Sequence, residues 1–446
     1  SLTKAIRILI ACSLLALTAC GERSSDYGRP DKSRQQPVEL ILLENGLPDP
    51  AVLADEQLVR RGNGEEPETL DPHQAVGVSA SHILRDLFEG LINESPDGKV
   101  IPGAALRWNI SRDARTYTFY LRRDLEWSNG DPLTAEDFVF SLRRAASPET
   151  ASNAANMLLP ILNAREVLAG ELPAEELGIS LLDDFTLQIT LTGPTPYFLG
   201  LLTHPVAYPV NRKNVEEFGD QFSKPGNLVS NGAYTLIGWR PRVEVELQKN
   251  PRFREAENTL IESVFYYPIE DLATEVTAFR SGEIDWTNEV PNYQFKWLQE
   301  HYPDELVVSP WMGSYFFGFN LTQEPFIDNP SLRMALTLSI DRQIITEKVT
   351  QFGEIPSYSL VPHGIDGYVP FTPEYADWTQ EERNHEARRL LEQAGYSEDN
   401  PLHIEIRYNT SDNNKKIALA IASMWKQTLG VNSTLVNEEF RVFLQN

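Results

Sequence analysis

The stretch LHIEIRYNTSDNNKKIALAIASMWKQTLGVNSTLVN (402–437) contains three segments with different hydrophobic periods. Apolar and polar residues alternate over 402–409, which predicts a β-strand. Residues 415–429 have helical spacing and end at Gly430, and 431–437 alternate again. This order predicts a βαβ crossover with two parallel strands and a helix on one face. Because ligands bind at the carboxyl edge of such sheets in open α/β folds, the unit indicates a mixed α/β protein.

Further segments with the period of strands lie along the chain after residue 40. Each places its apolar residues on one face, which is typical of half-buried strands. They are TYTFYLR (116–122), TLQITLT (186–192) and VEVELQ (243–248).

Helix-start signals precede three amphipathic segments. In a capping box, the side chain three residues after the cap accepts a hydrogen bond from the backbone of the cap. The signals and the predicted helices are Thr134 with Asp137 for 135–146, Thr379 with Glu382 for 381–394, and Asn329-Pro330-Ser331 for 332–349. Together with the strands, they predict a mixed α/β architecture in more than one lobe.

The chain is strongly acidic. It has 446 residues, enough for two or three domains, with 64 acidic and 39 basic residues and a formal net charge of −25. This charge repels nucleic acids and anionic membrane surfaces, so a nucleic-acid partner is not expected.

The first residues have the composition of an export signal. Lys4 and Arg7 flank an apolar core, ILIACSLLALTA (8–19), which is too short to cross a bilayer as a helix. This pattern predicts a secretory signal peptide over 1–19, with a buried N-terminal helix as the alternative. No methionine opens the sequence, so we expect that the true start codon is missing.

The motif Leu17-Thr18-Ala19-Cys20 resembles the lipobox of bacterial lipoproteins. The resemblance implies cleavage before Cys20 and a diacylglycerol on its thiol, which would hold the protein at a membrane. Residues 20–45 are then the lipidated cysteine and a flexible tether. Cys12 leaves with the signal peptide, so the mature chain has no disulfide and no cysteine-based metal site.

Motifs of common enzymes are absent from the sequence. It has no GxxxxGK[ST], GxGxxG, HExxH or GxSxG pattern. The seven histidines are scattered, which leaves only a metal site built from distant residues as an alternative. The acidic pair Asp183-Asp184 is more typical of a turn than of a glycosidase. We therefore expect no catalytic residues, no cofactor and no metal ion.

Aromatic residues are concentrated in SPWMGSYFFGFN (309–320). As a strand, this segment would place Trp311 and Phe317 on one face and Phe316 on the other. One interpretation is a strand buried on both faces. The other is a strand at the edge of a ligand pocket, where glycines admit a ligand and aromatic rings form the wall.

Motifs over residues 55–446 resemble the periplasmic oligopeptide-binding proteins of ABC importers, which are family 5 extracellular solute-binding proteins. The motifs include LDPH (70–73), DLFEGL (86–91), WSNGDPLTAEDFVFS (127–141), NGAYTL (231–236) and RSGEID (280–285). The resemblance implies two hinged α/β lobes with an extra α/β domain, closing around a peptide that is held by main-chain hydrogen bonds.

The resemblance also implies domain boundaries. Residues 50–88 and 212–312 would form the first lobe, 89–211 the extra domain, and 313–446 the second lobe. A further C-terminal part would return to the first lobe, so we expect the sequence to be a fragment.

Positions of the peptide site can be carried over by motif. Gly77 and Val78 match the segment that pairs with the ligand backbone. His204 and Asn409 match polar pocket positions, although a loop histidine with one local bond and a turn asparagine are the alternatives. The matches to aromatic pocket walls are Trp311, Phe316 and Phe440, of which Phe440 is alternatively plain core.

Other positions depart from the family pattern. An acidic position is Val76, a pocket tyrosine is Ala154, and basic positions near the ligand carboxylate are Thr350 and Asn414. The resemblance implies that the aspartate that receives the peptide α-amino group, and two arginines, would lie beyond residue 446.

The implied protein is a lipid-anchored monomer of the periplasm or cell envelope. It would bind short peptides and deliver them to an ABC permease and ATPase complex. Two alternatives remain open: the same fold dedicated to murein peptides or another small ligand, and a periplasmic chaperone or sensor lipoprotein.

Overall fold

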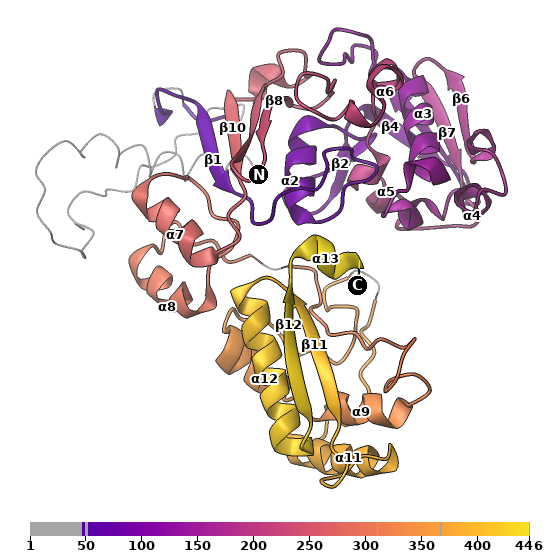
Figure 1. The fold of residues 1–446 in the computed structure, drawn as a ribbon. Helices are drawn as coiled ribbons and strands as arrows, with labels where there is room; N and C mark the ends of the chain where they lie inside the picture. The colour runs from indigo at the N-terminus through magenta and orange to yellow at the C-terminus, as the bar shows by residue number, and fades with distance from the viewer. Residues whose placement is uncertain (1–46, 50–51, 310, 366–367, 446) are drawn as a thin grey trace, which may run out of the picture. The chain divides into compact units, whose positions relative to one another are not determined.

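The computed structural model describes residues 47–49, 52–309, 311–365 and 368–445. The predicted signal peptide, the tether and Cys20 lie outside these residues. The chain divides into two compact units (Figure 1). The first unit ends at Ile269 and resumes over Thr274–Asn288, and the second unit comprises Glu270–Ala273 and continues from Glu289. The finer division into a first lobe, an extra domain and a second lobe stays a prediction.

The first unit contains a four-stranded sheet with the order β1-β10-β9-β8 (Figure 1). Its strands are β1 (Leu58–Gly62), β10 (Ser263–Tyr267), β9 (Glu244–Lys249) and β8 (Tyr234–Arg240). β1 is parallel to β10, and the other pairs are antiparallel. Helix α2 (Val78–Leu87) buries Ile83, Leu84 and Leu87 in the core that this sheet also lines. The sheet and helix thus bring residues near 60, 80 and 265 together.

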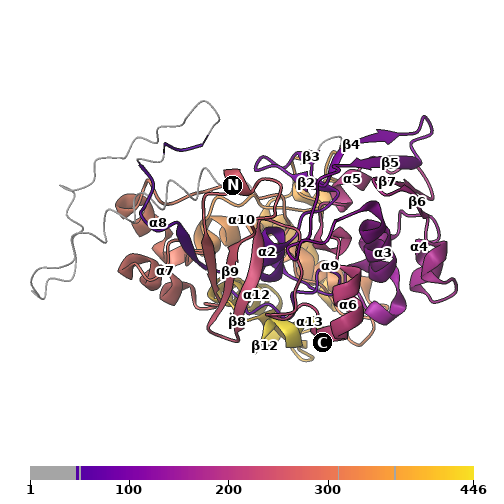
Figure 2. The same ribbon diagram turned by 90° about the horizontal axis from the view of Figure 1, so that it is seen from above.

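A second sheet of the first unit has the order β4-β5-β7-β6, all antiparallel. Helix α3 packs against β6 and β7 (Figure 2). Its Phe138 is fully buried, as are Phe119 and Trp127. The elements are β4 (Ala105–Ile110), β5 (Thr116–Leu121), β7 (Thr186–Thr190), β6 (Ile179–Asp183) and α3 (Ala135–Ala146). The predicted strands 116–122, 186–192 and 243–248 are confirmed as β5, β7 and β9.

Shorter elements complete the first unit. They are the antiparallel pair β2 (Ile92–Glu94) and β3 (Val100–Pro102), the helices α4 (Ala164–Leu168), α5 (Phe198–Leu201) and α6 (Arg212–Phe218), the 3-10 turn η5 (Pro205–Ala207), and α7 (Leu272–Ser281), which begins in the second unit.

The second unit contains the predicted βαβ crossover. Strands β11 (His403–Asn409) and β12 (Asn432–Glu438) are parallel, and α12 (Asp412–Leu429) joins them (Figure 1). Gly430 ends α12 with a φ of 67°. Ile404, Ile406 and Tyr408 of β11 share a core with Ala418, Ile421 and Trp425 of α12. The prediction from 402–437 is therefore confirmed.

The helix-start signals predict two helices correctly and one only in part. The Asp137 carboxylate accepts from the Thr134 N–H at 2.9 Å before α3, and Glu382 accepts from the Thr379 N–H at 2.7 Å before α11 (Gln380–Gln393). The single helix predicted over 332–349 is wrong. The chain instead forms α9 (Pro330–Leu338), a break, α10 (Arg342–Ile344) and a π-helical turn (Ile345–Thr350). The break covers residues 339–341, just before Arg342, whose side chain donates to the Thr337 and Ile340 carbonyls.

The remaining helices of the second unit are α8 (Asn292–His301) and α13 (Phe440–Gln445). Among the described residues, no helix is long and apolar enough to span a membrane.

Candidate functional site

Helix α2 begins at the two residues expected to meet a ligand backbone. Gly77 precedes the helix with a φ of 86°, a conformation that glycine adopts at no steric cost. No side chain caps this helix start, and Val78 is 50% exposed. Val78 therefore lies at the surface, whereas Ser79 and Ala80 of the same turn are buried.

A buried asparagine holds this turn to the end of β1. Asn63 is 2% exposed, and its Nδ2 donates to the Ser79 carbonyl at 3.0 Å. Its Oδ1 lies 3.1 Å from Nδ1 of His82, one turn further along α2. Burial, followed by the charge of Arg61, lowers the pKa of His82 to about 4, so the imidazole is neutral at pH 7. Asn63 thus fixes the position of the turn that follows Gly77.

His204 lies in the same unit, at the start of η5. Its Nδ1 accepts from the Val206 N–H at 3.1 Å, which leaves the proton of a neutral imidazole on Nε2. Burial and the charge of Arg85 lower the pKa of His204, which favours the neutral form. Turn η5 packs against α2, so His204 belongs to the same part of the first unit as Val78.

The LDPH motif forms a buried ion pair that sequence reasoning did not identify. Arg144 of α3 donates to both carboxylate oxygens of Asp71 at 3.0 and 2.7 Å, and to His73 Nδ1 at 2.8 Å. The other ring nitrogen of His73 lies 2.9 Å from the Tyr208 carbonyl. Burial raises the pKa of Asp71, but Arg144 and His73 outweigh it and lower the pKa overall. The motif therefore positions the 204–208 loop beside α2.

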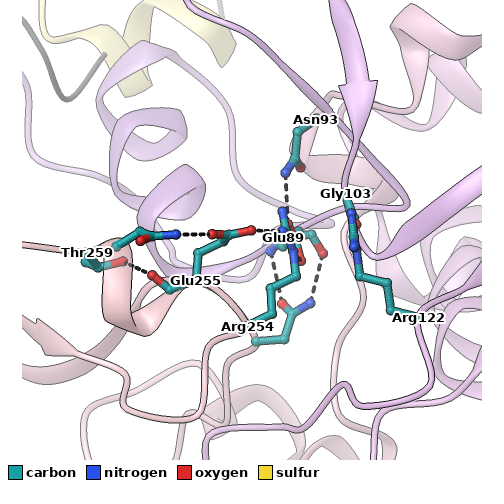
Figure 3. Close-up of polar contacts among 9 residues, drawn as sticks. Glu89, Asn93, Gly103, Arg122, Arg254, Glu255 and Thr259 are labelled. Atoms are coloured by element: carbon teal, nitrogen blue, oxygen red, sulfur yellow. Dashed lines mark hydrogen bonds and ion pairs between the residues drawn. The ribbon is translucent and has the colours of Figure 1, made fainter. Parts of the chain in front are cut away.

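A second buried pair joins three segments of the first unit (Figure 3). Glu89 is 4% exposed, and Arg254 donates to it through Nε at 3.0 and 3.1 Å and through a terminal nitrogen at 2.7 Å. Asn93 donates to the same carboxylate at 3.0 Å. Asn231 exchanges two hydrogen bonds with the Glu89 backbone, at 3.1 and 2.9 Å. Hydrogen bonds thus connect the DLFEGL motif (86–91) with the NGAYTL motif (231–236).

Asn409 ends β11 in the second unit, where its side chain contacts Asn414. Nδ2 of Asn414 donates to its Oδ1 at 3.0 Å, so the amide NH₂ of Asn409 remains as a donor. Phe440 begins α13, which packs against β11, and is half-buried. These two predicted residues therefore belong to neighbouring elements.

The aromatic segment does not form the predicted strand. Over residues 311–320 the structure has no strand, so the interpretation of a strand buried on both faces is wrong. Trp311 is 79% and Phe316 66% exposed, whereas Phe317 and Phe319 pack against the core of the second unit. No described strand lies beside the segment, so its main chain is not held in a ladder.

The predicted site residues thus fall into two groups. Gly77, Val78 and His204 belong to the first unit, and Trp311, Phe316, Asn409 and Phe440 to the second. No group of three or more histidine, cysteine or acidic residues is arranged to hold a metal ion in the part of the chain that the structure describes.

Comparisons with known proteins agree on one family. Residues 99–446 match the family model "Bacterial extracellular solute-binding proteins, family 5 Middle". The periplasmic oligopeptide-binding protein OppA of Escherichia coli is 44% identical over 407 residues, which cover 91% of this chain and 75% of that protein.

Solved structures agree with the sequence match. Haemophilus influenzae OppA in complex with the peptide RPPGFSPFR is 39% identical with a TM-score of 0.84, covering 88% of this chain and 77% of that one. The murein tripeptide-binding protein MppA of E. coli is 36% identical with a TM-score of 0.85, at 88% and 77% coverage. A structure of MppA in an unliganded open form gives a TM-score of 0.62 at 88% and 76% coverage.

Proposed function

The chain belongs to the bacterial extracellular solute-binding proteins of family 5, and from this membership we propose that it captures short peptides in a closing cleft and delivers them to the permease of an ABC importer. The observation that carries the proposal is the 44% identity to an oligopeptide-binding protein over 91% of the chain. The two-lobed α/β fold of its structural relatives suits such capture, because hinged lobes close around a ligand.

The peptide would be held mainly through its backbone. The uncapped turn at Gly77 and Val78 offers main-chain groups, and His204 Nε2–H and the Asn409 amide offer donors to peptide carbonyls. Backbone groups are the same in every peptide, so these contacts would accept many sequences. The exposed rings of Trp311 and Phe316, with Phe440, would contact peptide side chains.

The remaining parts of the proposal concern the cell envelope. A lipid on Cys20 would hold the protein at a membrane of the periplasm, and the binding unit would act as a monomer without catalysis. Its partners would be the permease and ATPase of the importer. The domain boundaries 50–88 with 212–312, 89–211 and 313–446 belong to the same proposal.

A second candidate ligand is a murein peptide. MppA matches this chain with a TM-score of 0.85, as close as the peptide-bound OppA relative. Murein peptides are short peptides, so the two candidates differ in ligand and not in mechanism.

Native mass spectrometry of the purified protein tests the proposal. Released ligands that are peptides of mixed sequence would support a general peptide receptor, and a single murein peptide would favour the second candidate. A protein that carries no peptide and takes up none from a peptide mixture would refute both and favour the chaperone or sensor alternative.

Variants of the proposed contacts test the site. Loss of one hydrogen bond is worth about 0.5–1.5 kcal/mol, so we expect His204→Ala and Asn409→Ala each to raise the peptide Kd by about 2–12-fold. His385→Ala, at an exposed histidine of α11, is the matched control and should leave Kd unchanged. Equal Kd values for all three variants would contradict the assigned contacts.

A further inference from the structure

The chain passes between the two units at three places. The divisions follow Ile269, Ala273 and Asn288, so α7 starts in the second unit and continues in the first. Residues 285–288 run beside the end of β1, because Arg61 and Trp286 form a parallel bridge and the Gly62 N–H donates to the Trp286 carbonyl at 2.8 Å.

Glu275 connects two of these passages within the first unit. It stands two residues after the Ala273 division and is fully buried. Its Oε1 accepts from the backbone N–H of Asn288, the last residue before the third division, at 2.8 Å. A hydrogen bond to a carboxylate in a buried site is among the stronger ones in proteins. The Glu275 side chain thus holds the segment after Ala273 close to the segment before Glu289.

The Gly-Asn-Gly sequence at 62–64 lies against Glu275 and Asn288. A Cβ on Gly62 would overlap the Glu275 carboxylate. A Cβ on Gly64, which has a φ of 69°, would lie 3.2 Å from Nδ2 of Asn288. Gly62 is therefore needed for the position of Glu275, and the positive φ of Gly64 favours glycine at the second position.

Asn63, between these two glycines, contacts helix α2, which begins at the proposed ligand segment. Asn63 donates to the Ser79 carbonyl and lies 3.1 Å from His82 Nδ1, which fixes the first two turns of α2. Gly77 and Val78 begin the same helix. A continuous set of buried contacts therefore runs from the proposed ligand segment to the two passages.

We propose that Glu275 is a positioning residue for ligand capture. Its carboxylate holds the passages after Ala273 and before Glu289 in the geometry from which the units close on a ligand, although it does not touch the ligand. This inference rests on the proposed function. A residue that biases an open–closed equilibrium changes the apparent Kd by changing the competent fraction. The relative MppA has an unliganded open form, as such an equilibrium requires.

The test compares Glu275→Ala and the milder Glu275→Gln with Glu89→Gln. Glu89 is a matched control because it is a buried carboxylate of the same unit that accepts from Asn93 and Arg254. Calorimetric titration with the peptide RPPGFSPFR gives Kd, and thermal unfolding gives stability. We expect Glu275→Ala to raise Kd about 5–30-fold, with a smaller rise for Glu275→Gln, as is typical of coupled sites. Glu89→Gln should lower Tm without changing Kd.

Two results would overturn the inference. One is an unchanged Kd in both Glu275 variants. The other is a rise in Kd for Glu89→Gln that matches the rise for Glu275→Gln at equal loss of Tm, since this would indicate general destabilisation.

A second measurement separates this inference from the proposed function. Fluorophores on Glu217→Cys and Glu392→Cys, both exposed and one in each unit, report the distance distribution between the units in the ligand-free protein. Failure of the wild type to bind peptide refutes the proposed function. The inference is then judged by this distribution alone: a change in Glu275→Gln supports it, and an unchanged distribution refutes it.

Discussion

Replacing Arg254 by methionine should strongly destabilise the first unit. Arg254 makes three hydrogen bonds to Glu89. The Arg254 side chain is 16% exposed and the Glu89 side chain is 4% exposed. Without the guanidinium, the Asn93 side chain is the one donor to this carboxylate that remains among the residues that the structure describes. Removal of one partner from a buried ion pair costs about 3–5 kcal/mol. Because Asn93 remains, we expect a loss near the lower end, about 3 kcal/mol of unfolding free energy.

Arg252→Met supplies a matched control two residues away. Arg252 pairs with Glu126 at 2.8 Å, but the two side chains are 48% and 45% exposed. Such a surface pair is worth about 0–1 kcal/mol, so its removal should cost no more than that. The two arginines differ in their own burial and in that of their partners, and Arg254 also pairs with the exposed Glu255.

Urea unfolding at pH 7, followed by tryptophan fluorescence, measures both losses. The double variant Glu89→Gln/Arg254→Met should recover part of the stability, because no buried charge is left unpaired. A loss in Arg254→Met no larger than in Arg252→Met would refute the reasoning, since burial would then not determine the cost.

Three further outcomes follow from single sites. Gly62→Ala should lower the unfolding free energy by about 1–3 kcal/mol, because its Cβ would overlap Glu275; Gly200→Ala, with open space around the Cβ, should not destabilise in the same urea assay. Burial lowers the pKa of His73 to about 4 from 6.5, so its stabilising contribution is full above pH 6.5 and is lost as pH falls from 6.5 to 4. The loss is about 3 kcal/mol, and His73→Gln should remove this part of the pH dependence when unfolding is measured at several pH values. The part due to His82, whose pKa is also lowered to about 4, should remain. Trp311→Ala should leave Tm within about 2 °C because the ring is 79% exposed, yet weaken binding of peptides with aromatic side chains in calorimetry.

Local patterns in the sequence predicted the elements whose signals are contained within a few neighbouring residues. The βαβ unit over 402–437 is correct because period, helix end and strand length all lie within that stretch. Capping at Thr134 and Thr379 is correct for the same reason, since a capping box joins residues only three apart. The family, too, could be identified from motifs.

Two predictions failed because distant partners decide them. The alternation in 309–320 is compatible with a strand, but a strand also needs a neighbour for its hydrogen bonds, and the described residues supply none. The apolar period over 332–349 continues through Arg342, yet the helix breaks where that side chain bonds to backbone carbonyls and to the Ser357 carbonyl. Neither requirement can be read from the local period.

The sequence by itself determined the composition, the predicted strands 116–122, 186–192 and 243–248, and the βαβ unit over 402–437, because each depends on neighbouring residues. It also placed Gly77, His204 and Asn409 as expected ligand contacts through motif resemblance. Only the tertiary structure decided that Asp71 pairs with Arg144, that Glu89 pairs with Arg254, and that Glu275 lies against Gly62. These partners are far apart in the chain. Asp71 and Glu89 are each buried with an arginine because burial of an unpaired charge is costly, and Glu275 accepts a backbone hydrogen bond from Asn288.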